Sequence, residues 1–349
     1  MIGKKQRLPA LGLAAAGLCA SLVLVAVHVR SHTEPDYESV CSVAQGFDCS
    51  AVALSRFSVL LGVPVPAIGA AGFVALGLAF YRGYRIALPL AALASVASVV
   101  LLAVELLVIR SVCLLCEVVH LCSWAMLWLA WVSRAALAPA PRTGLMAVLA
   151  APTALVALSA FAASSYTAPT SWTSMGDVPR GVGGDGLHWA GAKSPALTVT
   201  EYVDYSCPHC GVAARKTRRV FADKFDRLRL VRFPLSRMRC VRLAEGANRS
   251  CEFVRAALCA GDVGKFWEMD GWLLSHAPGT AVLDVERASR EVGIDPSVLT
   301  ECMRSPDTFR RADALAAAAM RRHMVEAPAY TVGDRKLSAR EAHERLDAL

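Results

Sequence analysis

Charged residues are scarce in this chain, above all in its first half. They make up 19% of the 349 residues, whereas hydrophobic residues make up 55%. Five long apolar runs contain only two acidic residues, Glu105 and Glu117, and neither Lys nor Arg. This composition excludes an ordinary soluble globular protein. The second half carries more charge and is typical of a water-soluble domain.

Each apolar run is long enough to cross a bilayer, which takes roughly 20 residues. The flanking Lys and Arg account for the net charge of +8 better than a nucleic-acid partner does, because basic residues collect on the cytoplasmic side of spans. They predict a multi-pass protein of a bacterial inner (cytoplasmic) membrane, with its N-terminus in the cytoplasm and its C-terminal domain outside. The first run lacks a clear small-x-small cleavage site, which favours its retention as a true span. The five runs are Ala10–Val29, Pro64–Tyr81, Ile86–Ile109, Val112–Val132 and Gly144–Ala163.

Twelve cysteines, most of them in close pairs, indicate an oxidising compartment. Cys113 and Cys116 form a Cys-x-x-Cys at the start of the fourth run, where a dithiol can pass electrons between water and a carrier dissolved in lipid. Cys41 and Cys49 lie in the first outer loop, on the same side of the membrane. These two cysteines can form a permanent structural disulfide or take part in thiol-disulfide exchange. The second pair on the same side of the membrane favours exchange.

His120 shares a helical face with Cys116. Ionisable groups inside a membrane are costly and usually functional. Reduction of a quinone takes two electrons and two protons, so a hydrogen-bonding or proton-relaying group beside the thiolate is needed, and His120 fits that role. The alternative is a histidine whose hydrogen bonds are satisfied within the bundle. Cys19 and Cys122 have no evident partners and are interpreted as small apolar residues.

The order of these cysteines resembles that of the vitamin K epoxide reductase family. The shared pattern is Cys-x7-Cys, a Ser six residues later, and Cys-x-x-Cys heading a later span, and the resemblance covers residues 10–135. It implies a four-helix membrane bundle around a quinone, as a catalytic domain over residues 1–135. It further implies that Cys116 faces the quinone, Cys113 exchanges with Cys49, Cys41 receives electrons from a thioredoxin-like partner, and Ser55 lies near the quinone ring.

One departure from the family narrows the expected chemistry. Vertebrate members bind the quinone oxygens with Asn and Tyr, whereas this sequence has no matching Asn and has His120 at the Tyr position. The departure favours simple reduction of ubiquinone or menaquinone over epoxide chemistry.

A fifth apolar helix and a flexible linker are expected over residues 136–194. Residues 164–194 are rich in Ser, Thr, Gly and Pro and have no periodic apolar face. The helix therefore carries the second domain to the outer side. Tethering raises the effective concentration of one redox pair at another.

Ala196–Val203 alternates like a strand with one buried face, and Cys207-Pro208-His209-Cys210 follows it at the start of a basic helix. A thiolate at a helix N-terminus is stabilised by the helix dipole and by unpaired N–H groups. Cys207 is therefore the expected nucleophile and Cys210 the buried resolving thiol. A zinc site is the rival interpretation, but it needs two more ligands at matching spacing, so no metal is expected.

This segment resembles the thioredoxin superfamily, and Cys-Pro-His-Cys is the motif of its DsbA-like oxidants. The resemblance covers residues 195–349, with a helical insertion at 244–323. It implies an α/β thioredoxin-like domain, a buried acid at Glu201 beneath the active site, and a cis-proline at Pro328 that lies against the disulfide.

The insertion holds four more cysteines, for which structural disulfides are expected. Four cysteines allow three pairings, and none of these forms a Cys-x-x-Cys. The simplest pairing is Cys240 with Cys251 and Cys259 with Cys302.

The sequence as a whole predicts a membrane thiol-disulfide oxidoreductase that carries electrons from reduced secreted proteins to a quinone. Two rival hypotheses stay open. One is an electron importer that reduces disulfides outside the membrane, for which Cys19 and Cys122 are the only candidate carriers. The other is a non-catalytic membrane protein with structural disulfides or bound metal.

Overall fold

The computed structural model describes residues 4–34, 37, 39, 41, 47–167, 178–236, 238–240, 249–276, 282–324 and 326–348. The chain forms two compact units. The first comprises Met1–Thr33 with Glu38–Ala168, and the second comprises Glu34–Tyr37 with Pro169–Leu349.

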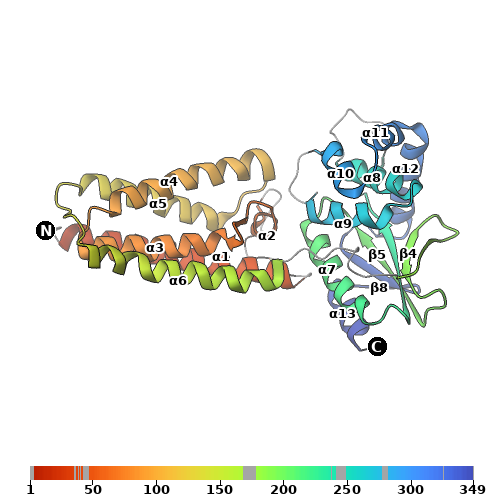
Figure 1. Ribbon diagram of the computed structural model, residues 1–349, viewed down its shortest axis with the longest axis horizontal. Coiled ribbons are helices and arrows are strands. Elements are labelled where there is room, and N and C mark those ends of the chain that lie inside the picture. The colour runs from red at the N-terminus through yellow and green to blue at the C-terminus, as the bar shows by residue number, and fades with distance from the viewer. Residues whose placement is uncertain are drawn as a thin grey trace. The chain divides into compact units, whose positions relative to one another are not determined.

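Four long helices of the first unit pack side by side, and consecutive helices run in opposite directions (Figure 1). Helix α1 (Lys4–Thr33) packs along α3 (Val65–Arg82) and α5 (Leu114–Val132), and α4 (Ala87–Val104) packs against α3 and α5. A fifth helix, α6 (Arg142–Thr167), packs on α3. All five are long and apolar enough to cross a membrane, as the sequence predicts.

Small residues line the contacts of α3 with its neighbours, which lets the helix backbones approach closely. At Gly17 of α1, the ring of Phe73 occupies the space that a Cβ atom would need. The buried alanines of α3 are Ala67, Ala70, Ala71, Ala75 and Ala79.

The link between α4 and α5 is tightly folded. Helix α4 continues into one π-helical turn, η1 (Glu105–Ile109), and Arg110 follows in the left-handed region with φ of 58°. Cys113 then caps α5, and its Sγ accepts a hydrogen bond from the backbone N–H of Cys116. The π-helical turn and the left-handed residue together place the Cys-x-x-Cys at the end of the bundle.

The link between α1 and α3 contains a short helix and a hairpin. Helix α2 (Cys49–Ala53) is capped by Asp48, whose carboxylate accepts from two backbone N–H groups. Strands β1 (Val59–Leu60) and β2 (Val63–Pro64) pair in antiparallel fashion, with Gly62 in the left-handed region of their turn. This link covers the same end of the bundle as Cys113.

The expected linker at 164–194 differs from the structure. Helix α6 runs to Thr167, and residues 180–182 and 188–191 are strands. These strands are too short for a periodic apolar pattern, and pairing with the sheet, rather than local sequence, holds them in place. Residues 168–177 lie outside the described part of the chain.

The second unit is built on a six-stranded sheet in the order β3-β4-β6-β5-β7-β8. Strands β5 and β6 are parallel, and every other neighbouring pair is antiparallel. The strands are β3 (Arg180–Val182), β4 (His188–Gly191), β5 (Leu197–Val203), β6 (Leu228–Pro234), β7 (Ala329–Val332) and β8 (Arg335–Leu337).

Helices cover this sheet on both faces. The main core gathers Val199 and Val203 of β5 with residues of α7, α9 and α13, whereas Tyr202 and Phe233 point the other way and pack against α12. Ser338 and Glu341 form a capping box at the start of the last helix. The helices are α7 (Pro208–Ala222), α8 (Arg249–Asp262), α9 (Phe266–His276), α10 (Val285–Val292), α11 (Pro296–Arg304), α12 (Pro306–Arg321) and α13 (Ala339–Asp347).

Candidate redox sites

In the first unit, the backbone beside Cys49 pairs with the segment that precedes α5. The N–H of Asp48 donates to the carbonyl oxygen of Val112 at 3.2 Å, and Phe47 forms a parallel β-bridge with Val112. Cys49 directly follows Asp48, and Cys113 directly follows Val112, so each cysteine is the next residue after one end of this hydrogen bond. Both also line one cavity. The fold thus brings together one cysteine from each pair of the membrane unit.

The two pairs of this unit have different covalent states. Cys41 and Cys49 form a disulfide with a Cα–Cα distance of 5.7 Å. Cys113 and Cys116 are thiols, and the N–H of Cys116 lies 3.3 Å from Cys113 Sγ. Cys113 is fully buried, whereas Cys116 is half-buried. A dithiol beside a disulfide is the arrangement that exchange requires.

Glu105 supports this dithiol. Its Oε2 accepts a hydrogen bond from the N–H of Cys113 at 2.9 Å, and its side chain is also within hydrogen-bonding reach of Cys116. In the sequence, Glu105 precedes Arg110 by about one helical turn, a spacing that allows an ion pair between the two side chains. The left-handed turn at Arg110 instead leaves the Glu105 carboxylate directed at the cysteines. The sequence feature that points to this role is an acidic residue inside an apolar run, because such residues are costly in a membrane and usually functional.

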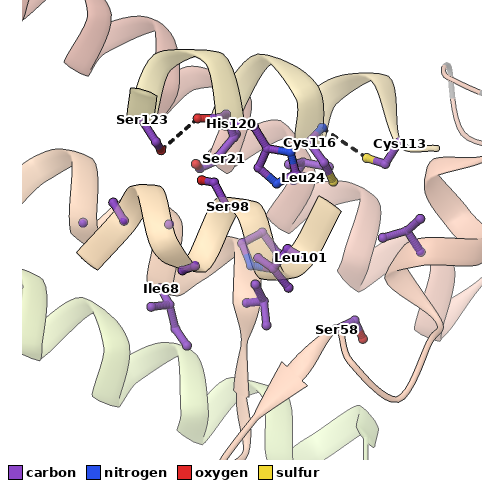
Figure 2. Close-up of a pocket in the computed structure, with 18 of the residues that line it drawn as sticks. Ser21, Leu24, Ser58, Ile68, Ser98, Leu101, Cys113, Cys116, His120 and Ser123 are labelled. Carbon is purple, nitrogen blue, oxygen red and sulfur yellow. Dashed lines mark hydrogen bonds between the residues drawn. The ribbon is translucent and has the colours of Figure 1, made fainter. Parts of the chain in front are cut away.

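A cavity of about 280 Å³ lies inside the bundle, between α1, α3, α4 and α5. Its wall is mostly apolar, with a few polar side chains, which is the usual character of a site for an organic ligand. Figure 2 shows Cys116 and His120 projecting from α5 toward it, with Ser21 and Ser98 nearby. Its lining includes the polar or ionisable residues Ser21, His28, Ser55, Ser58, Glu105, Ser98, His120 and Ser123, as well as Cys49, Cys113 and Cys116.

The three residues expected at the quinone, Ser55, Cys116 and His120, all line this cavity. Ser55 is 4% exposed, and its hydroxyl has no hydrogen-bond partner among the described residues. His120 is 2% exposed, and its Nδ1 lies 3.6 Å from an Oε of Glu117. The sequence places Glu117 on a different part of the helix surface from Cys116, and the structure pairs it with His120 instead.

In the second unit, Cys207 caps the N-terminus of α7, with Pro208 in the first turn. The turn is held by hydrogen bonds from the N–H of Cys207 to Asp204 O at 2.9 Å and from the N–H of Cys210 to Cys207 O at 3.2 Å. The carboxylate of Asp204 accepts from the N–H and the hydroxyl of Ser206 at 2.9 and 2.6 Å. The strand-to-helix turn thus places Cys207 at the positive end of the helix dipole.

Cys210 is fully buried, and this burial, with a hydrogen bond to Cys207, raises the pKa of the Cys210 thiol well above its ordinary value. Cys207 is 7% exposed. Its Sγ–H donates to the carbonyl oxygen of Ala327 at 3.5 Å. The Ala327–Pro328 peptide bond is cis. The chain segment before Pro328 therefore lies against Cys207.

Glu201 is completely buried, and it belongs to a larger polar network. The Nη1 of Arg232 lies 2.6 Å from Glu201, and the Nε of Arg232 lies 2.9 Å from Asp270. The hydroxyls of Tyr330 and Tyr205 donate to Glu201 and Asp270 at 2.6 and 2.9 Å, respectively. Burial lowers the pKa of Arg232, but the two carboxylates outweigh that effect and raise it above its ordinary value. The sequence gives no sign of Arg232, because a basic residue in a strand is usually exposed.

The four cysteines of the helical insertion form two disulfides, Cys240–Cys251 and Cys259–Cys302. These are the same pairs that the sequence analysis names. Asp262 lies beside the second disulfide, and its carboxylate is held by two hydrogen bonds from Arg311. Because the two sulfurs are bonded to each other and the carboxylate is paired with Arg311, this group is a poor cation site.

Two family models match the chain. Residues 8–131 match the vitamin K epoxide reductase family, and residues 185–349 match a thioredoxin family. The first match contains all four cysteines of the membrane unit's two pairs. The second contains the Cys-Pro-His-Cys and Pro328.

Several solved structures are similar to the second half of this chain. A thioredoxin-like oxidoreductase from Silicibacter pomeroyi is 26% identical, with a TM-score of 0.39, over 48% of this chain and 92% of that one. The MdbA protein of Corynebacterium diphtheriae is 16% identical, with a TM-score of 0.39, over 51% and 100%. BdbD from Bacillus subtilis is 19% identical, with a TM-score of 0.38, over 50% and 100%.

The similar curated proteins are much longer than this chain. The Na(+)/H(+) antiporter NhaA 1 of Salinispora arenicola is 36% identical over 89 residues, and the antiporter NhaA 3 of Salinispora tropica is 30% identical over 108 residues. These matches cover 26% and 31% of this chain but only 13% and 16% of the antiporters. The chain therefore spans less than a fifth of these relatives.

Proposed function

We propose that this chain, which joins a vitamin K epoxide reductase family domain to a thioredoxin-like domain, makes disulfides outside the bacterial inner membrane and passes the electrons to a quinone. The two matched domains support the activity, a disulfide oxidoreductase of the membrane, and the proposal adds its route and its acceptor. Electrons from reduced secreted proteins pass through three couples in turn: Cys207–Cys210, Cys41–Cys49 and Cys113–Cys116.

Each transfer between couples is the attack of a thiolate on a disulfide through a mixed disulfide. In the last step, the thiols of Cys113 and Cys116 form an S–S bond and lose two electrons and two protons. The quinone takes up both and becomes a quinol. Ubiquinone and menaquinone both fit this balance, because each has two carbonyl oxygens that become hydroxyls.

The observation that carries the proposal is the β-bridge between the segments that hold Cys49 and Cys113. The hydrogen bond from Asp48 to Val112 fixes these segments side by side. It supports direct exchange between Cys49 and Cys113, which leaves Cys41 as the sulfur that meets the incoming reductant.

The cavity supports a quinone as the acceptor. Cys49, Cys113 and Cys116 line the same apolar space as Ser55 and His120. In this proposal, Ser55 and His120 bind the head group of the quinone, and its chain lies along the apolar wall. The flanking basic residues support an orientation in which this end of the bundle faces outside.

The proposal is tested with the purified full-length chain, a reduced peptide and a short-chain ubiquinone or menaquinone. We expect one quinone to be reduced for each disulfide formed. The loss of quinone absorbance measures the quinone reduction. Peptide oxidation that needs no quinone, or quinone loss without disulfide formation, would contradict it. The Cys207→Ala variant should abolish peptide oxidation in the same assay.

A further inference from the structure

His28 of α1 is a buried titratable group that the proposed route leaves without a role. It is 1% exposed and lines the cavity. Ser21 and Leu24 of the same helix also line it. Their spacing of three and four residues places all three on one face of α1, the face toward the cavity.

The ring nitrogens of His28 are poorly satisfied by the protein. Neither Nδ1 nor Nε2 makes a hydrogen bond of ordinary geometry with the described residues, although the ring lies beside the backbone of Ala53. Its aromatic neighbours are His32, at 4.2 Å between ring centroids, and Tyr166, at 5.9 Å. A buried polar group without a partner costs about 1–3 kcal/mol, so a ligand in the cavity that pairs with His28 is favoured.

His28 and His120 reach the cavity from different helices, each from the same end of the bundle (Figure 1). His28 is five residues before the end of α1, and His120 is six residues after the start of α5. At 1.5 Å per residue, the two rings attach about 8 and about 9 Å inside the ends of their helices. These ends lie at the same end of the bundle (Figure 1).

A 1,4-quinone has two carbonyl oxygens on opposite sides of its ring, and both must be stabilised as charge develops on them. We propose that His28 donates a hydrogen bond to the oxygen that lies away from Cys116, while the α5 side of the cavity binds the other. This inference rests on the proposed quinone reduction. The electrons and protons still come from the thiols of Cys113 and Cys116, and His28 acts as a positioning residue.

The test compares three variants of the full-length chain in the peptide-to-quinone assay. His28→Phe keeps a ring and removes both nitrogens, and His28→Gln restores an N–H donor. Leu22→Phe is the control, because Leu22 is an exposed residue of the same helix that is not part of the cavity lining. We expect His28→Phe to raise the KM for quinone about tenfold, the size of a lost hydrogen bond. His28→Gln should recover much of this, and Leu22→Phe should behave like the unchanged chain.

A second measurement separates binding from folding. A single turnover without quinone reports transfer from peptide to the Cys41–Cys49 pair, and we expect His28→Phe to leave its rate unchanged. In a Cys116→Ser background, a bound short-chain quinone should slow the modification of His28 by diethylpyrocarbonate, read by mass spectrometry. An unchanged KM in His28→Phe, an equal effect of Leu22→Phe, or no protection by quinone would overturn the role of His28. If the unchanged chain reduces no quinone at all, it is the proposed function that fails.

Discussion

The carboxylate of Glu105 accepts a hydrogen bond from the backbone N–H of Cys113 at 2.9 Å. Both groups are buried, and Cys113 is also the residue that caps α5. Glu105 therefore holds the backbone of Cys113, beside the segment that contains Asp48 and Cys49.

Replacement of Glu105 by Leu should destabilise the membrane unit by about 1–3 kcal/mol, because the N–H of Cys113 loses its acceptor. Glu105→Gln keeps an amide oxygen and should stay close to the unchanged chain. Thermal unfolding in detergent, together with the quinone reduction rate, measures both effects. A Gln variant as unstable as the Leu variant would show that the acceptor oxygen is not what matters.

Cys116→Ser should stop quinone reduction and trap a bridge between Cys49 and Cys113, since the second thiol is no longer there to resolve it. Non-reducing peptide mapping detects that bridge. Cys122→Ser is the control, because Cys122 is a buried thiol of the same helix that is not part of the cavity lining. Loss of activity in Cys122→Ser would favour a different route for the electrons.

Alkylation of the reduced second unit in the full chain should reach Cys207 well before Cys210. The pKa of Cys210 is raised, so its reactive thiolate is populated only at a pH well above that of an ordinary thiol. Between pH 6 and 9, labelling of Cys210 should therefore stay low, and urea should abolish the difference. Mass spectrometry of the two peptides gives the rates. Equal alkylation rates of Cys207 and Cys210 in the folded protein would mean that burial does not keep Cys210 protonated.

Arg232→Met should cost about 3–5 kcal/mol of stability, because it leaves Glu201 and Asp270 buried without their cation. In the unchanged chain the raised pKa of Arg232 keeps it charged, and its contribution is lost only at a pH above the range of ordinary assays. In the variant the orphaned carboxylates can take up protons as the pH falls. The deficit should therefore be smaller at pH 5 than at pH 8. Chemical denaturation at both values measures it, with the exposed Arg227→Met as control.

Removal of the Cys259–Cys302 disulfide by a double Ala substitution should lower stability by about 4 kcal/mol, the loop-closure value for residues this far apart in sequence. Electron transfer should persist at temperatures where the variant stays folded, because this pair lies outside the proposed route. Turnover and thermal unfolding, measured side by side, separate the two effects. A folded variant without turnover would give the pair a redox role.

Much of the fold follows from local patterns. The five apolar runs predict the five long helices, and the alternation before Cys207 predicts β5. Strands β3 and β4 were missed, because each is short and is stabilised by its neighbours in the sheet rather than by its own sequence. The prediction of a linker over residues 164–194 is therefore wrong for residues 180–182 and 188–191, which are strands.

The sequence by itself determined which chemistry is available: thiol pairs at the ends of helices, an apolar half whose helices are long enough to cross a membrane, and a cysteine at a helix N-terminus. These follow from residue type and spacing, which need no knowledge of distant contacts. Only the tertiary structure decided that the segments holding Cys49 and Cys113 pair, that Glu105 turns to the cysteines, that Arg232 neutralises Glu201, and that His28 faces the cavity. Each of these depends on residues far apart in the chain, or on one left-handed turn, and helix or strand periodicity carries no information about either.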